Sequence, residues 1–201
     1  MSDTSDAVRA ETRARIRANW TDRLLSAAAG VVAASALAVS VYQAYITRQQ
    51  QKLSAWPYLV QYMNNGDGGY ERVVHNVGIG PALVRSMTIT VDGRPMHTWR
   101  DVGRVLYGDS LEAIARRDSA QSITSTFGRG SVLLPATPIR MLRLTGRTVP
   151  ARVQELLSSD RVEMRVCYCS LYDDCWVAST RQEEPSPARA CAVDRAREFR
   201  D

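Results

Sequence analysis

Residues 82–91 read ALVRSMTITV and lead directly into Asp92-Gly93. The segment is rich in β-branched and apolar residues, and every second side chain of an extended strand points to the same face. The residues expected to share that face are Leu83, Arg85, Met87, Ile89 and Val91. Asp-Gly is a strong signal for a two-residue hairpin turn. The segment therefore predicts an antiparallel hairpin whose second strand covers 94–99.

Short runs of the same kind occur on both sides of this hairpin, separated by turn residues. They predict strands at 56–63, 70–77, 122–127, 139–144, 162–169 and 176–179. Two short helices are expected between them, at 109–117 and 148–157. This spacing of strands favours an immunoglobulin-like β-sandwich, with a small barrel as the alternative.

A long apolar run precedes the β segment. Leu24–Thr47 contains 24 consecutive residues without a charge, whereas about twenty helical residues cross a bilayer. Trp20, Tyr42 and Tyr45 lie near its ends, where aromatic rings favour the headgroup region. We expect a retained transmembrane helix. A cleaved signal peptide, with Ala36-Leu37-Ala38 as the cleavage site, is the main alternative.

The charges that flank this run predict its orientation. Five arginines precede it, and only Arg48 and Lys52 follow closely. The positive-inside rule then places the N-terminus in the cytoplasm and the chain after the helix outside it. The expected organisation is a cytoplasmic basic arm (1–23), a transmembrane helix (24–47), an extracytoplasmic β-sandwich (54–181), and a polar linker with a C-terminal helix (182–201). The expected location is the plasma (inner) membrane.

Small residues recur every fourth position along the apolar run. A row of this kind lets a second helix approach closely, either from another copy of the chain or from a different membrane protein. The row consists of Ser26, Gly30, Ala34 and Ala38.

The charge distribution disfavours nucleic acid as a partner. Residues 54–201 hold nineteen basic and seventeen acidic side chains, so the formal charge of +5 comes largely from residues 1–53. No dense basic face with interleaved aromatic residues is present. Lys52 is the sole lysine among 26 basic residues, which suggests a GC-rich bacterial genome.

The four cysteines are Cys167, Cys169, Cys175 and Cys191. An even number outside the cytoplasm favours disulfides. A Cys169–Cys175 bridge would close a hairpin and leave Cys167 to tether the tail through Cys191, but three connectivities are open. A zinc site is the alternative; the single-residue gap between Cys167 and Cys169 and the lack of a nearby histidine argue against it. We expect no metal.

The stretch Asn76-Val77-Gly78-Ile79-Gly80-Pro81-Ala82 raises the question of a nucleotide-binding loop. A dinucleotide loop has a third glycine and leads into a helix, whereas here Pro81 leads into a strand. Gly78 and Gly80 are therefore expected to permit a tight corner, and Asn76 to form a hydrogen bond across it. We expect no cofactor.

Gly108-Asp109-Ser110-Leu111 matches the signature of the GDSL esterases. A nucleophilic serine needs a base, and in that family a histidine near the C-terminus supplies it. The only histidines here, His75 and His97, both precede Ser110. Asp109 followed by Glu112 is better explained as a helix N-terminus of the capping-box type. We expect both histidines to be structural and name no catalytic residue.

Several motifs together resemble one protein group. They are Trp56-Pro57-Tyr58, the Asn-x-Gly-x-Gly-Pro-Ala run at 76–82, Asp92-Gly93, Tyr168-Cys169-Ser170 and Cys175-Trp176. The chain from about residue 20 to about residue 180 resembles uncharacterised bacterial single-span membrane proteins. The resemblance implies an inner-membrane anchor with a compact β domain, and it brings no catalytic residues.

The sequence thus favours a membrane-anchored, non-enzymatic module that presents a β-sandwich to a protein partner. Two alternatives stay open. One is an envelope hydrolase that uses Ser110. The other is a sensory or accessory subunit of a membrane complex.

Overall fold

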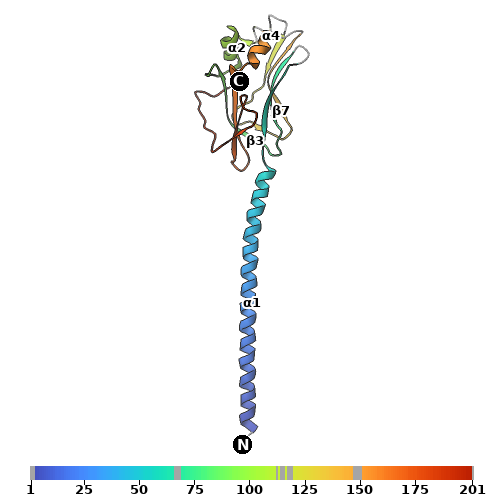
Figure 1. Cartoon of the computed structure of the whole chain (residues 1–201), viewed down its shortest axis with the longest axis vertical. Coiled ribbons are helices and arrows are strands. Elements are labelled where there is room, and N and C mark those ends of the chain that lie inside the picture. Colours follow the sequence, from blue (N-terminus) through green and yellow to red (C-terminus); the bar gives the residue numbers. More distant parts are fainter. Residues whose placement is uncertain are drawn as a thin grey trace. The chain divides into compact units, whose positions relative to one another are not determined.

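The computed structural model describes residues 3–65, 69–111, 113, 116, 120–146 and 151–200. The chain divides into two compact units, Met1–Gln51 and Lys52–Asp201. A single helix, α1 (Asp3–Ser54), makes up the described part of the first unit (Figure 1). Its stretch Trp20–Ser54 is long and apolar enough to cross a membrane, and none of its most apolar window is buried. A signal sequence would meet the same criteria.

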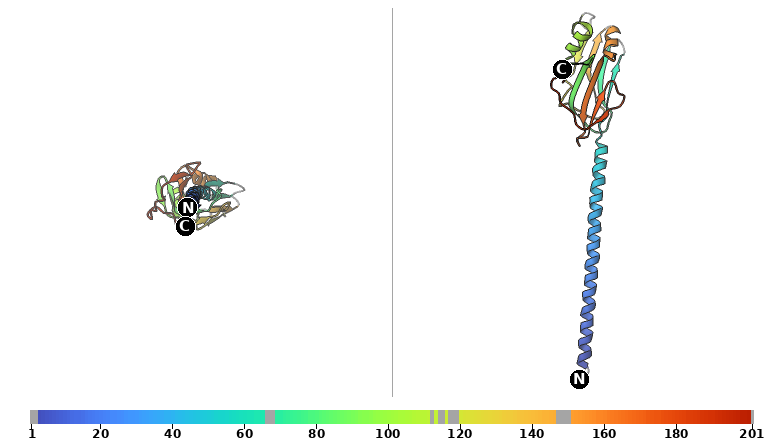
Figure 2. Two further views of the ribbon diagram at one scale, coloured as in Figure 1. Left: turned by 90° about the horizontal axis from the view of Figure 1, so that it is seen from below. Right: turned by 60° about the vertical axis from the view of Figure 1, so that its left-hand side comes forward.

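The second unit contains two antiparallel sheets and short helices. The first sheet has the order β1 (Leu59–Asn64), β2 (Tyr70–Asn76), β7 (Pro138–Gly146), β5 (Ala120–Thr124). The second has the order β10 (Ser186–Ala188), β9 (Cys175–Ser179), β8 (Val162–Cys169), β3 (Ala82–Val91), β4 (Arg94–Met96), and β6 (Val132–Leu133) also pairs with β3. The helices include α2 (Trp99–Tyr107) and α4 (Ala151–Ser158). The strands lie in two layers (Figure 2).

Both sheets contribute to one hydrophobic core. Val74 and Leu142 of the first sheet and Met87, Ile89 and Val166 of the second belong to a single buried cluster. The prediction of a mainly β fold preceded by an apolar N-terminal helix is confirmed at this level.

The face that β3 buries differs from the expected one in its first half. Met87, Ile89 and Val91 are buried as predicted, but Leu83 is only partly buried and Arg85 is exposed. The register against β8 shifts between Val84 and Ser86, so Ala82 and Val84 point into the core instead. A bulge of this kind reverses which alternate residues face inward.

The hairpin after β3 forms at Asp92-Gly93. Both residues have positive φ (51° and 78°), as a type I′ turn requires. Arg161 donates two hydrogen bonds to the Asp92 carboxylate, of 2.9 and 2.6 Å. These bonds lower the pKa of Asp92, although both groups lie on the surface.

Helix α2 replaces the end of the strand expected over 94–99. Thr98 and Asp101 form a reciprocal capping box at its start, and Trp99 is buried in its first turn. The strand therefore ends at Met96. For the helix expected at 109–117, Leu111, Ala113 and Arg116 are helical, and the intervening residues lie outside the described part.

The C-terminal helix expected within 182–201 does not form in the described residues. Ser186–Ala188 pairs with β9 as strand β10. Phe199 N donates to Met87 O, and Arg200 N donates to His97 O. Pairing with other segments thus occupies backbone groups that a helix would have paired internally.

Candidate functional site

The side chain of Asn76, at the end of β2, forms four hydrogen bonds. It is fully buried. Its Oδ1 accepts hydrogen bonds from Tyr58 N (3.2 Å) and Gly78 N (3.0 Å). Its Nδ2 donates to Gly80 O (2.8 Å) and Leu133 O (3.0 Å). One amide thus pairs two donors and two acceptors of three separate chain segments, which no apolar side chain could do.

The link after Asn76 carries the chain from the first sheet to the second. Ile79 N and Gly80 N both donate to Trp56 O, at 3.0 and 3.1 Å, and Val77 N donates to Tyr58 O at 2.9 Å. The link is therefore held against the segment through which the chain enters the domain.

Gly78 and Gly80 are needed for this close approach. Neither is among the glycines with positive φ, so the requirement is space and not backbone conformation. A Cβ at Gly78 would overlap the backbone of residues 56–58, and one at Gly80 would overlap the Ala55 carbonyl. The corner expected from the sequence is present, and its glycines serve close contact.

We predict that Gly80→Ala lowers the free energy of unfolding by about 1–3 kcal/mol, because the Ala55 backbone must shift. Gly128→Ala is the matched control. A Cβ at Gly128 would meet only Phe199 O, at 3.7 Å, and Gly128 is not among the positive-φ glycines. Urea unfolding of the full chain in detergent, followed by tryptophan fluorescence, measures both. Equal effects of the two substitutions would contradict the close-contact role.

Tyr168 forms a further hydrogen bond with the segment through which the chain enters the β domain. Leu59 N donates to Tyr168 Oη at 3.2 Å, and the Tyr168 ring stacks on Trp176 with 5.9 Å between ring centroids. Burial raises the pKa of Tyr168 to about 12, so the phenol stays protonated at neutral pH. The start of β1 is thus bonded to the end of β8 as well as to Asn76.

All four cysteines are in disulfides. Cys167 is bonded to Cys191, and Cys169 is bonded to Cys175. This is the hairpin bridge and tail tether considered above, one of three connectivities. The Sγ atoms of Cys169 and Cys191 lie 3.8 Å apart, so the two bridges are in contact. No sulfur is left as a thiolate ligand for a metal.

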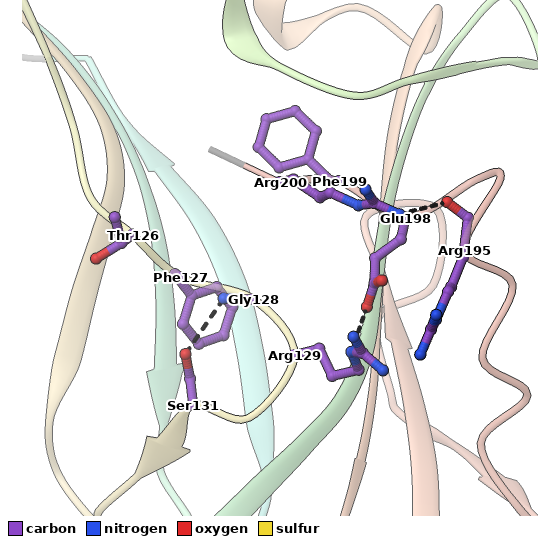
Figure 3. A pocket seen from close by; sticks show the side chains of 9 residues that line it. All are labelled: Thr126, Phe127, Gly128, Arg129, Ser131, Arg195, Glu198, Phe199 and Arg200. Carbon is purple, nitrogen blue, oxygen red and sulfur yellow. Dashed lines mark hydrogen bonds and ion pairs between the residues drawn. The ribbon is translucent and has the colours of Figure 1, made fainter.

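The C-terminal segment lines a cavity of about 660 Å³ together with the loop after β5 (Figure 3). Arg129 Nε lies 3.0 Å from Oε1 of Glu198, a residue only 4% exposed. Arg200 donates to Arg195 O at 2.9 Å, and Ser131 Oγ accepts from Gly128 N. No histidine or cysteine is among the described residues that line the cavity.

Ser110 caps a helix in the structure. Its Oγ accepts from Ala113 N at 3.2 Å, while Asp109 Oδ1 accepts from Ser110 N at 2.8 Å. The N-cap is therefore Ser110 and not Asp109; Glu112 lies outside the described residues. Within the described part, Ser110 forms no hydrogen bond with either histidine.

We predict that Ser110→Ala lowers the free energy of unfolding by about 1 kcal/mol, the usual cost of losing a serine cap. Thermal unfolding measures the loss. Ser110→Asp is the control, because its carboxylate can still cap and should retain most of the stability. A loss shared equally by both variants would contradict the capping role.

The two histidines have separate structural surroundings. His75 lies on β2 and packs its ring edge-on to Tyr62, with 6.4 Å between centroids. His97 Nδ1 lies 3.1 Å from Glu198 O. The structure therefore does not bring the two together with a nucleophile in its described part.

The small-residue row on α1 is uncovered in this structure. Ser26, Gly30, Ala34 and Ala38 are all exposed, and a Cβ at Gly30 would meet nothing within 4 Å. Ser26 Oγ donates to Asp22 O within the helix.

Comparison with known proteins adds no assignment to this geometry. No protein-family model, curated protein or solved structure matches the chain. Its function must therefore be argued from the residues themselves.

Sequence reasoning missed the Arg129–Glu198 pair and the full set of bonds at Asn76. Glu198 lies in a segment whose composition predicts a polar tail helix, so its burial had no local signal. A bond from Asn76 across the corner was expected, but its partner Leu133 O is 57 residues away.

Proposed function

We propose that the chain is a membrane-anchored, non-enzymatic binding or assembly module. In this proposal, α1 crosses the plasma membrane through residues 24–47, and the β domain, an immunoglobulin-like sandwich, is presented to a protein partner outside the cytoplasm. The proposal includes membership of the group of bacterial single-span proteins that the motifs resemble.

One observation carries the proposal. The most apolar window of Trp20–Ser54 has a mean hydropathy of 2.1, and none of it is buried. A soluble protein would expose this surface to water at a large cost in free energy, whereas a bilayer would cover it.

Two further features support the extracytoplasmic side. Disulfides persist in oxidising compartments and are rare in the cytosol, and all four cysteines here are paired. The excess of arginines before the span favours the same orientation.

Membrane extraction and crosslinking of the full chain test the proposal together. We expect the chain to stay in the membrane fraction after alkaline carbonate treatment and to form a crosslinked complex with a second protein or a second copy. Release by carbonate would refute the anchor, and a chain that crosslinks to nothing would refute the binding role.

Gly30→Leu/Ala34→Leu separates these two roles, because leucine preserves the apolar run while blocking close helix approach. We expect this variant to remain in the membrane but to lose the complex if the partner packs on the row. Val31→Leu, one position off the row, is the matched control and should leave both properties unchanged.

A further inference from the structure

Large apolar or aromatic side chains are exposed where the chain enters the β domain. They come from the entry segment, the β2–β3 link, the segment after β6 and the β8–β9 turn. We call this patch the entry pole; its members are Trp56, Val77, Ile79, Leu134, Leu171 and Tyr172.

Hydrogen bonds and an ion pair hold these four segments together within the second unit. The link is bonded to the entry segment through Trp56 O. The strand β6 is bonded to the link through Asn76 and Leu133. The β8–β9 turn contacts the start of this unit through Asp174, whose Oδ2 lies 3.2 Å from Nζ of Lys52, in the last turn of α1. The exposed apolar side chains therefore belong to one end of the domain.

The two carboxylates of the β8–β9 turn are paired with cations. Asp174 pairs with Lys52, and Asp173 Oδ1 lies 3.3 Å from Arg85 Nη2. Since each carboxylate of the turn has a basic partner, the turn does not present an unpaired negative charge to anionic lipid headgroups.

The length of chain between the apolar run and the entry pole limits what can cover the pole. Eight residues, 48–55, separate the end of the run at Thr47 from Trp56. As helix they span about 12 Å. The headgroup layer on each side of a bilayer is about 5–8 Å thick. A helical tether of this length keeps Trp56 within about 12 Å of the hydrocarbon edge, only a few ångströms beyond the headgroup layer.

We propose that the entry pole lies on the headgroup layer of the membrane that α1 crosses, with its apolar side chains inserted at the lipid interface. This rests on the proposed function, because it requires that residues 24–47 span the bilayer. Trp and Tyr favour this interface, since their rings are apolar while their N–H and O–H groups remain hydrated. The insertion holds the domain against the membrane surface.

Photo-crosslinking of the full chain in nanodiscs tests the inference. The nanodiscs contain phosphatidylcholine, phosphatidylglycerol and a phospholipid with a diazirine close to its headgroup. We expect lipid adducts on residues 77–79 and 171–172, and on the ends of the 24–47 run. Adducts on the run alone would overturn the inference and leave the anchor intact. Absence of adducts from the run would overturn the proposed function itself.

An aspartate variant sharpens this test. Ile79 is 65% exposed and Leu171 is 59% exposed, so Ile79→Asp/Leu171→Asp leaves the core untouched. We expect adducts on the entry pole to fall several-fold while adducts on the run persist. Ile123→Asp is the matched control, because Ile123 is 51% exposed on β5 and belongs to none of these four segments. An equal fall in the control, or no fall in the double variant, would contradict the inference.

Discussion

Asn76→Ala is expected to lower the free energy of unfolding by about 3–5 kcal/mol, because it removes four hydrogen bonds at once. Two backbone N–H groups and two carbonyls lose their partner. Each buried group left unpaired costs about 1–3 kcal/mol, and water that enters the vacated space would recover part of the total.

Thermal and urea unfolding of the full chain in detergent measure this effect. For a domain of this size, a loss of 4 kcal/mol corresponds to a fall in Tm of about 10 °C. Asn64→Ala is the matched control, since Asn64 lies on β1 and is exposed; its effect should stay within about 0.5 kcal/mol. If Asn76→Ala changes stability no more than the control does, Asn76 does not hold the corner together.

Removal of the Cys167–Cys191 bridge, which tethers the C-terminal tail, is expected to have the second large effect on stability. Cys167→Ala/Cys191→Ala should lower the free energy of unfolding by about 3.5 kcal/mol, because this bridge closes a long loop in the unfolded chain. The sequence separation is 24 for Cys167–Cys191 and 6 for Cys169–Cys175. Loss of the shorter bridge should cost about 2.4 kcal/mol by the same reasoning.

Cys169→Ala/Cys175→Ala, which removes the shorter bridge, is the control for loop length. Urea unfolding gives the order of stabilities, and limited trypsin digestion reports on the tail, which should be cut faster at Arg189 and Arg195 when only the long bridge is absent. A smaller loss for the long bridge than for the short one would be inconsistent with a tether that acts through chain entropy.

The sequence was most informative where the signal was local. The Asp92-Gly93 turn, the alternation in residues 87–91 and the long apolar run each depend on neighbouring residues, and each element is present. Thr98 and Asp101 also form a local signal, a capping box, but the alternating pattern before them predicts a strand that continues to Trp99.

Features that depend on distant partners could not be predicted from the local sequence. The bulge between Val84 and Ser86 is a property of the pairing with β8, and nothing in the ALVRSMTITV stretch marks it. The tail after Pro187 has a polar, helix-compatible composition, yet Cys191 bonds to Cys167 and Phe199 pairs with Met87. Tertiary contacts thus overrode local preference in this segment.

Asn76 combines a feature that local sequence predicts with one that depends on a distant partner. The corner was predictable from its glycines and Pro81. The reason for asparagine at this position lies in the carbonyl of Leu133, which folding brings to the corner from 57 residues away.

The central claim is that α1 anchors the chain in the membrane and that the β domain lies on the extracytoplasmic side. The single lysine allows a direct test. Lys52 follows the apolar run, and its side chain is 33% exposed. Arg13→Lys adds one lysine before the run. In right-side-out bacterial membrane vesicles, a membrane-impermeant amine reagent should label Lys52 at once, and the amine introduced by Arg13→Lys only after permeabilisation. Labelling of the introduced amine first, or of both amines equally in intact vesicles, would contradict the account.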